Sequence, residues 1–118
     1  MTDERRSSTR RTASLAGELE SPQGKSAIAI TRDVSAGGLL VFTRLRLEVG
    51  ASVKIMVLYK DEQVSFPGTV LREQTLTPNE STLWRSKVAI GVDPHDPALT
   101  KLYAALADQP AILERSES

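Results

Sequence analysis

Several residue types that define large functional classes are absent or scarce in this sequence. Its 118 residues include no cysteine, a single histidine and 4% aromatic residues. The lack of cysteine excludes disulfide frameworks, cysteine-based zinc sites and thiol nucleophiles. No apolar run approaches the roughly 18 residues of a membrane helix, and no apolar stretch follows Met1, so we expect neither a membrane segment nor a secretory signal. We therefore expect one small cytoplasmic domain.

The charge balance argues against a further class. The chain has 15 Lys and Arg residues against 15 Asp and Glu residues, so its formal net charge is zero. Proteins that coat nucleic acid depend on an excess of positive charge, and we do not expect a nucleic-acid partner. Four arginines nevertheless gather near the start of the chain, at Arg5, Arg6, Arg10 and Arg11.

Turn-forming residues divide the rest of the chain into short apolar segments with a period of two. The strands expected from this pattern cover residues 13–19, 26–31, 39–42, 53–59, 64–70 and 82–92. Short strands that follow one another without βαβ units predict a mainly β fold, a small antiparallel barrel or sandwich.

The apolar period becomes helical after Pro97. Its members recur at Leu99, Leu102, Tyr103 and Leu106, which predicts one amphipathic helix. Asp96 is its expected N-cap. The chain is thus divided into an arm over residues 1–12, expected to be flexible, a barrel with its helix over 13–108, and a tail over 109–118.

Nothing in the sequence supports catalysis or a metal site. His95 lies between two Asp-Pro pairs that suit a turn and a helix cap. The sequence has no G-x-S-x-G or H-E-x-x-H motif, and no positioned base accompanies Ser35. We therefore expect no enzyme, no metal and no cofactor.

The arginine cluster has two interpretations. A short run of like charge is typical of a solvated tail. Arg6 and Arg10 are, however, four residues apart with small hydroxyl residues between them. Guanidinium groups are planar, permanently charged and forked, so they bind phosphates or the O6 and N7 atoms of guanine with two hydrogen bonds.

The segment Asp33-Val-Ser-Ala-Gly-Gly38 also has two interpretations. It predicts a tight connection that interrupts the strands, with Asp33 and Ser35 bonded to nearby backbone and Gly37 and Gly38 at positive φ. The same residues suit a ligand, because a carboxylate accepts hydrogen bonds from a guanine edge, a hydroxyl donates to phosphate, and glycines allow close approach.

Taken together, the two segments resemble the PilZ domain family. Arg6 and Arg10 match its R-x-x-x-R motif, and Asp33, Ser35 and Gly38 match its [D/N]-x-S-x-x-G motif in the expected order and spacing. The resemblance covers most of the chain.

The end of the predicted barrel is a partial match to the family. Residues 90–92 are similar to the family's closing strand, although Asp93 stands where an aromatic residue is usual.

This resemblance implies a six-stranded antiparallel β-barrel that binds the bacterial second messenger cyclic di-GMP. Arg6 and Arg10 would hold guanine edges and phosphates. Asp33 and Ser35 would engage a guanine and its surroundings, and Gly38 would permit the close turn.

The resemblance also bears on stoichiometry and signalling. An arginine at the position of Arg5 tends in this family to accompany an intercalated ligand dimer. Arg11 and Gly37 are secondary candidates for the site. Ordering of the arm by the ligand would create or hide a surface for a downstream protein partner, which the sequence does not identify, and we expect a monomer or weak dimer.

Two alternatives stay open. One is a PilZ-like interaction module that binds no ligand. The other is a small nucleic-acid-binding barrel that uses the arginine arm, although few aromatic residues are available for base stacking.

Overall fold

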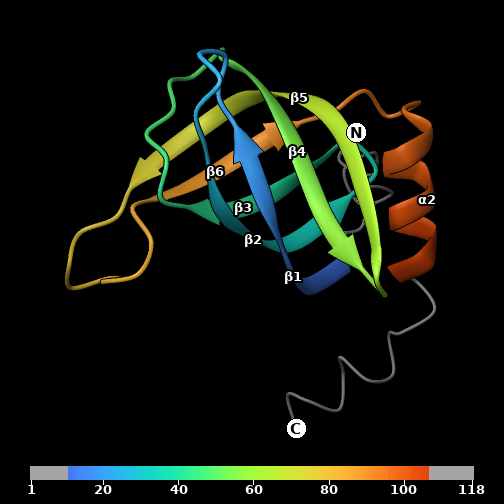
Figure 1. Ribbon diagram of the computed structural model, residues 1–118, viewed down its shortest axis with the longest axis horizontal. Helices are drawn as coiled ribbons and strands as arrows, with labels where there is room; N and C mark the ends of the chain where they lie inside the picture. Colours follow the sequence, from blue (N-terminus) through green and yellow to red (C-terminus); the bar gives the residue numbers. More distant parts are fainter. Residues whose placement is uncertain (1–10, 107–118) are drawn as a thin grey trace, which may run out of the picture.

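Six antiparallel strands close into a barrel. The computed structural model describes residues 11–106, and its strands are β1 (Arg11–Glu20), β2 (Ser26–Ser35), β3 (Gly38–Thr43), β4 (Ser52–Tyr59), β5 (Glu62–Thr75) and β6 (Ser86–Gly91). Their order around the barrel is β1-β2-β3-β6-β5-β4, and β4 pairs with β1 to complete it (Figure 1). The predicted six-stranded β-barrel is confirmed.

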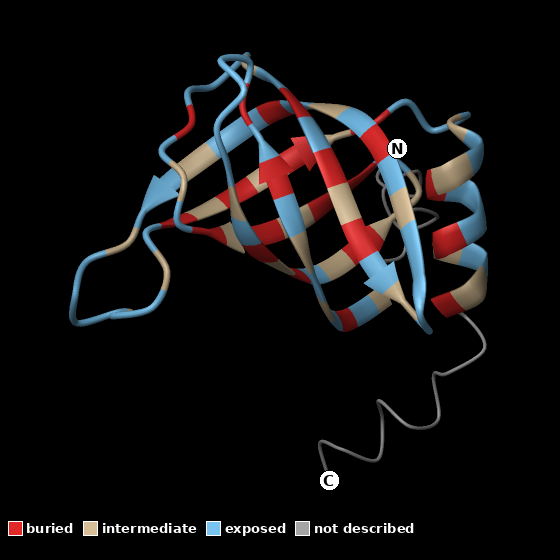
Figure 2. Cartoon of the chain, viewed as in Figure 1, coloured by how far each residue is buried: buried red, intermediate tan, exposed pale blue. Residues whose placement is uncertain are grey.

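Alternation along each strand builds the core. Successive side chains of a strand point to opposite faces, and apolar residues occupy the inner positions, as the banding in Figure 2 shows. One inner row runs across four strands, and its members are at most 2% exposed. This row consists of Val34, Leu39, Ile90 and Val70.

The helix α2 (Pro97–Leu106) follows the barrel and contacts β5 and β1 (Figure 1). Its side chains Leu99, Leu102 and Leu106 are buried, as the periodicity predicted. An Asp96 carboxylate oxygen accepts hydrogen bonds from the backbone N–H of Ala98 (2.9 Å) and of Leu99 (3.3 Å), which confirms the predicted N-cap. No helix within residues 11–106 has an apolar stretch long enough to cross a membrane.

The predicted interruption over residues 33–38 is wrong. β2 continues to Ser35, Ser35 pairs with Gly38, and only two residues connect the strands. Backbone pairing with β3 extends the strand beyond the point where side-chain polarity suggested that it ends. The expected positive φ is also wrong, because the described glycines with positive φ are Gly24 and Gly50.

Two other boundaries differ from the expectation. Arg11 and Thr12, expected in the arm, are the first residues of β1. The last strand begins at Ser86 instead of residue 82, because the segment before it folds into a loop. In that loop the Ser81 hydroxyl accepts hydrogen bonds from the backbone N–H groups of Leu83 and Trp84.

Irregularities in β2 and β5 determine which residues face outward. The pairing register shifts between Thr31 and Asp33 in β2 and between Val70 and Arg72 in β5. Thr31 and Val70 point inward, with 2% and 1% exposure. Strict alternation would place Asp33 and Arg72 inside the barrel as well. The extra residue in each β-bulge instead brings both side chains to the outer face.

Candidate ligand-binding site

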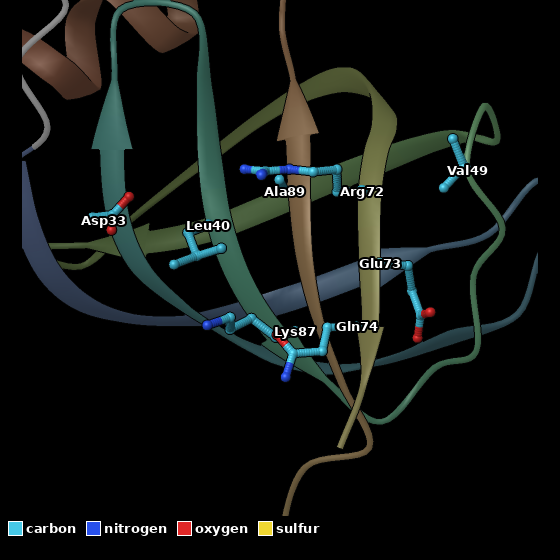
Figure 3. Close-up of a pocket in the computed structure, with 8 residues that line it drawn as sticks. All are labelled: Asp33, Leu40, Val49, Arg72, Glu73, Gln74, Lys87 and Ala89. Atoms are coloured by element: carbon cyan, nitrogen blue, oxygen red, sulfur yellow. The ribbon is translucent and has the colours of Figure 1, made fainter.

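An open pocket of about 550 Å³ lies on the outer face of the barrel. Strands β2, β3, β6 and β5 and the loop after β3 supply its walls and floor (Figure 3). Its lining residues are Asp33, Leu40, Val49, Arg72, Glu73, Gln74, Lys87 and Ala89.

Four of these residues form one cross-strand row. Asp33 on β2 pairs with Leu40 on β3, Leu40 pairs with Ala89 on β6, and Ala89 pairs with Arg72 on β5. With neighbouring strands about 4.8 Å apart, the row places Asp33 and Arg72 about 14 Å apart along the sheet. The pocket therefore has an acidic end, a short apolar floor and a basic end.

The basic end carries positive charge that is not neutralised by neighbouring carboxylates. Within residues 11–106, neither Arg72 nor Lys87 forms an ion pair. The carboxylate nearest in sequence, Glu73, accepts hydrogen bonds from the hydroxyls of Ser86 (2.9 Å) and Thr75 (3.1 Å). In Figure 3 its side chain points away from those of Arg72 and Lys87.

The remaining residues of the D-x-S-x-x-G motif lie beside this pocket. Ser35 and Gly38 pair with each other one outward-facing position beyond Asp33 and Leu40, and neither lines the pocket. The Ser35 hydroxyl donates a long hydrogen bond of 3.4 Å to the Gly38 carbonyl oxygen. Asp33 and Ser35 are half-buried and Gly38 is buried, and of the three only Asp33 reaches the pocket.

Gly38 is needed for strand contact rather than for a special turn. A Cβ atom added to it would lie 2.3 Å from the carbonyl oxygen of Ile90, a distance that no side chain tolerates. The neighbouring Gly37 has open space around it, and its carbonyl oxygen accepts a hydrogen bond of 2.9 Å from the Val92 N–H. Gly38 therefore allows β3 and β6 to approach closely beneath the motif.

The arginine cluster is only partly described. Arg5, Arg6 and Arg10 lie outside residues 11–106, so their positions relative to Asp33 stay predictions. Arg11 does not line the pocket, because its guanidinium carbon lies 4.0 Å from the centroid of the Tyr103 ring on α2. The start of β1 is thereby joined to the C-terminal helix.

Sequence patterns did not identify the basic end of the pocket. Arg44, Arg46 and Arg72 are all candidates to flank a ligand, and only the fold separates them. Arg72 lines the pocket with Asp33, Arg46 lines a different one of about 400 Å³ beside Trp84, and Arg44 lines neither. Lys87 carries no local signal at all, because a lysine in a strand is ordinarily a solvated side chain.

Residues 11–106 contain no group of three or more His, Cys, Asp or Glu side chains able to hold a metal ion. His95 is exposed, and its backbone N–H donates to the Asp93 carboxylate at 2.9 Å, as in an ordinary turn. The outer pocket brings a carboxylate, a short apolar floor and two cations together, an arrangement that suits a small polar ligand.

A family model matches most of the chain. The PilZ domain model matches residues 4–103 of the chain. No curated protein sequence gives a significant match.

Solved structures with the same fold are distant in sequence. The PilZ domain of CeSA from a cellulose-synthesizing bacterium shares 19% identity, with 85% of this chain and 99% of that chain covered and a TM-score of 0.63. The PilZ domain of Escherichia coli YcgR, solved with c-di-GMP, shares 16% identity over 96% and 94% of the two chains, with a TM-score of 0.64.

A third structure contains a second part that this chain does not match. The Bacillus subtilis inhibitor of motility, MotI/DgrA, shares 16% identity over 86% of this chain and 49% of its own, with a TM-score of 0.67. The family match and these folds lead to one conclusion: the chain belongs to the PilZ domain family.

Proposed function

We propose that this chain is a receptor for cyclic di-GMP that signals to a partner protein. The observation that carries the proposal is the position of Asp33, which lies at the edge of an outer pocket with two unpaired cations in a chain of the PilZ family. PilZ domains are ligand-binding and adaptor modules rather than enzymes. The ligand of the YcgR PilZ domain supports the choice of cyclic di-GMP.

The proposed contacts follow from the chemistry of the pocket. The Asp33 carboxylate accepts hydrogen bonds from the N1–H and N2–H groups of a guanine, whose flat face packs on Leu40. Arg6 and Arg10 close over the ligand and bind the guanine O6 and N7 atoms or a phosphate. Each bidentate contact of this kind contributes about 1–3 kcal/mol.

The proposed signal passes from the arm to α2. Arg11 directly follows Arg10 in the chain, and its guanidinium stacks on Tyr103. Within residues 11–106, the Arg11 Nε is the buried side-chain atom without a hydrogen-bond partner, so this contact leaves one donor unsatisfied. When Arg6 and Arg10 engage the ligand, Arg11 moves relative to Tyr103 and changes the surface that α2 presents to a partner.

Calorimetric titration of the full chain with cyclic di-GMP tests the proposal. Wild type is expected to bind, and Arg10→Ala and Asp33→Ala are expected to lose at least about tenfold in affinity. Arg85→Ala and Glu48→Ala are matched controls, since both residues are exposed and neither lines the pocket. Thermal denaturation of each variant separates lost binding from lost folding.

A titration without binding would contradict the proposal. Absence of heat and of chemical-shift changes at saturating cyclic di-GMP would overturn the receptor proposal. It would favour a PilZ interaction module that binds no ligand. A gel shift with single-stranded RNA in the same buffer tests the nucleic-acid alternative separately.

A further inference from the structure

We infer that Arg72 and Lys87 bind the phosphates of the ligand, so that the site extends across four strands, beyond both sequence motifs. This inference rests on the proposed function, because it assigns the part of the cyclic dinucleotide that occupies the basic end of the same pocket. Neither residue belongs to R-x-x-x-R or to D-x-S-x-x-G.

The direction in which the Arg72 and Lys87 side chains point is the first argument. Figure 3 shows both of them extended from β5 and β6 toward Leu40 and Asp33. Arg72 crosses its pairing partner Ala89, whose short side chain leaves room for the guanidinium above β6. The two cations thus face the acidic end across the floor of the pocket, instead of pointing into solvent away from it.

The charge of these two side chains is the second argument. Neither cation has an ion-pair partner among residues 11–106, and Glu73 is occupied by the Ser86 and Thr75 hydroxyls. Two unneutralised cations in one concave site favour an anion, and the fork of arginine suits phosphate oxygens. The carboxylate of Asp33 repels the same anion, so the phosphate belongs at the end of the pocket that is remote from Asp33.

The distance between Asp33 and Arg72 is the third argument. Asp33 and Arg72 are three strand spacings apart, about 14 Å along the sheet. This is the distance between the backbones, and the Arg72 side chain spans part of it by crossing Ala89. A guanine held by Asp33 therefore directs the sugar and phosphate of the dinucleotide toward β6 and β5, where Arg72 and Lys87 lie. The floor of Leu40 and Ala89 between the two ends is apolar, as stacking or sugar packing requires.

A titration series separates this inference from the proposed function. Cyclic di-GMP is titrated calorimetrically into wild type, Arg72→Ala, Arg72→Lys, Lys87→Ala and the control Arg85→Ala. Arg72→Ala is expected to weaken binding at least about tenfold, Lys87→Ala less, and Arg72→Lys to recover part of the loss, because charge is kept and the fork is not. Arg85 is also an exposed, unpaired arginine, but it lines the other pocket, and its removal is expected to leave the affinity within about twofold.

Phosphorus NMR of the bound ligand identifies the group that is contacted. The bound ³¹P resonances are expected to move toward their free positions in Arg72→Ala while the guanine proton shifts change less. A loss of affinity with unchanged ³¹P shifts would overturn the assignment to phosphate.

The titrations also separate a failure of this inference from a failure of the proposed function. If wild type binds, Asp33→Ala weakens binding and both Arg72→Ala and Lys87→Ala stay within about twofold of wild type, the inference is wrong and the receptor proposal stands. If wild type does not bind cyclic di-GMP, both are wrong. Equal melting temperatures of the variants confirm that the comparison concerns binding alone.

Discussion

Asp33 and Arg72 occupy opposite ends of one cross-strand row, and each is turned outward by a β-bulge in its own strand. Without the bulges, both charged side chains would share the inner face with Thr31 and Val70. Burial of unpaired charge inside the barrel would be strongly destabilising. The irregularities that protect the core are therefore the same ones that create the acidic and basic ends of the pocket.

The close contact between Gly38 and Ile90 leads to a prediction about stability. Gly38→Ala is expected to destabilise the fold by about 1–3 kcal/mol, because its Cβ would collide with the Ile90 carbonyl oxygen and push β3 away from β6. Chemical denaturation measures the change. Gly37→Ala is the matched control, with no atom within 4 Å of the added Cβ and no positive φ. Equal stabilities for the two variants would contradict the role given to Gly38.

The stacking of Arg11 on Tyr103 leads to a prediction about the helix. Arg11→Ala is expected to accelerate amide hydrogen exchange in the last turns of α2, since a partly desolvated cation–π contact contributes about 0.5–2 kcal/mol. Arg32→Ala is the control, because Arg32 also lies over an aromatic ring, that of Phe42, at 5.5 Å. It belongs to β2, whereas the main contacts of α2 are with β5 and β1. Unchanged exchange in Arg11→Ala would remove the link between arm and helix.

Thr43 tests the polar contacts inside the barrel. Its side chain is fully buried, its hydroxyl donates to the Ile28 carbonyl oxygen at 3.2 Å, and the same hydroxyl accepts from the Leu45 N–H at 3.2 Å. Thr43→Val keeps the shape, removes one hydrogen-bond partner from each of two backbone groups and is expected to cost about 1–3 kcal/mol. Thr43→Ser retains the hydroxyl and should cost less. A valine variant as stable as the serine variant would show that packing, rather than hydrogen bonding, dominates here.

The cap of α2 leads to a prediction about the turn before the helix. Asp96→Ala is expected to destabilise the protein by about 0.5–2 kcal/mol, because two N–H groups of the first turn lose their acceptor. His95→Ala is expected to change stability by less than about 0.5 kcal/mol, since the side chain is exposed. Thermal melts of the two variants provide the comparison, and a larger loss in His95→Ala would contradict it.

Local patterns were sufficient for the elements and for the family. Alternating apolar residues predicted six strands, and the spacing of Leu99, Leu102 and Leu106 predicted a helix whose apolar face is now found buried. These predictions succeeded because the period of a strand or a helix depends on neighbours within the same segment. Strand ends were less predictable, since Ser35 stays in β2 through its pairing with Gly38 on another strand.

Some residues of the candidate site could likewise be named from the sequence, and others could not. Asp33, Ser35 and Gly38 could be named from their spacing alone, because a motif is a property of consecutive residues. Lys87 could not, and Arg72 could not be separated from Arg44 and Arg46. Nothing along the chain indicates that β6 lies between β3 and β5 or that a bulge after Val70 turns Arg72 outward. The order of residues alone established the barrel, its helix and the acidic motif. Only the tertiary pairing of strands remote in sequence, β3 with β6 and β6 with β5, decided where the positive charge opposite that motif lies.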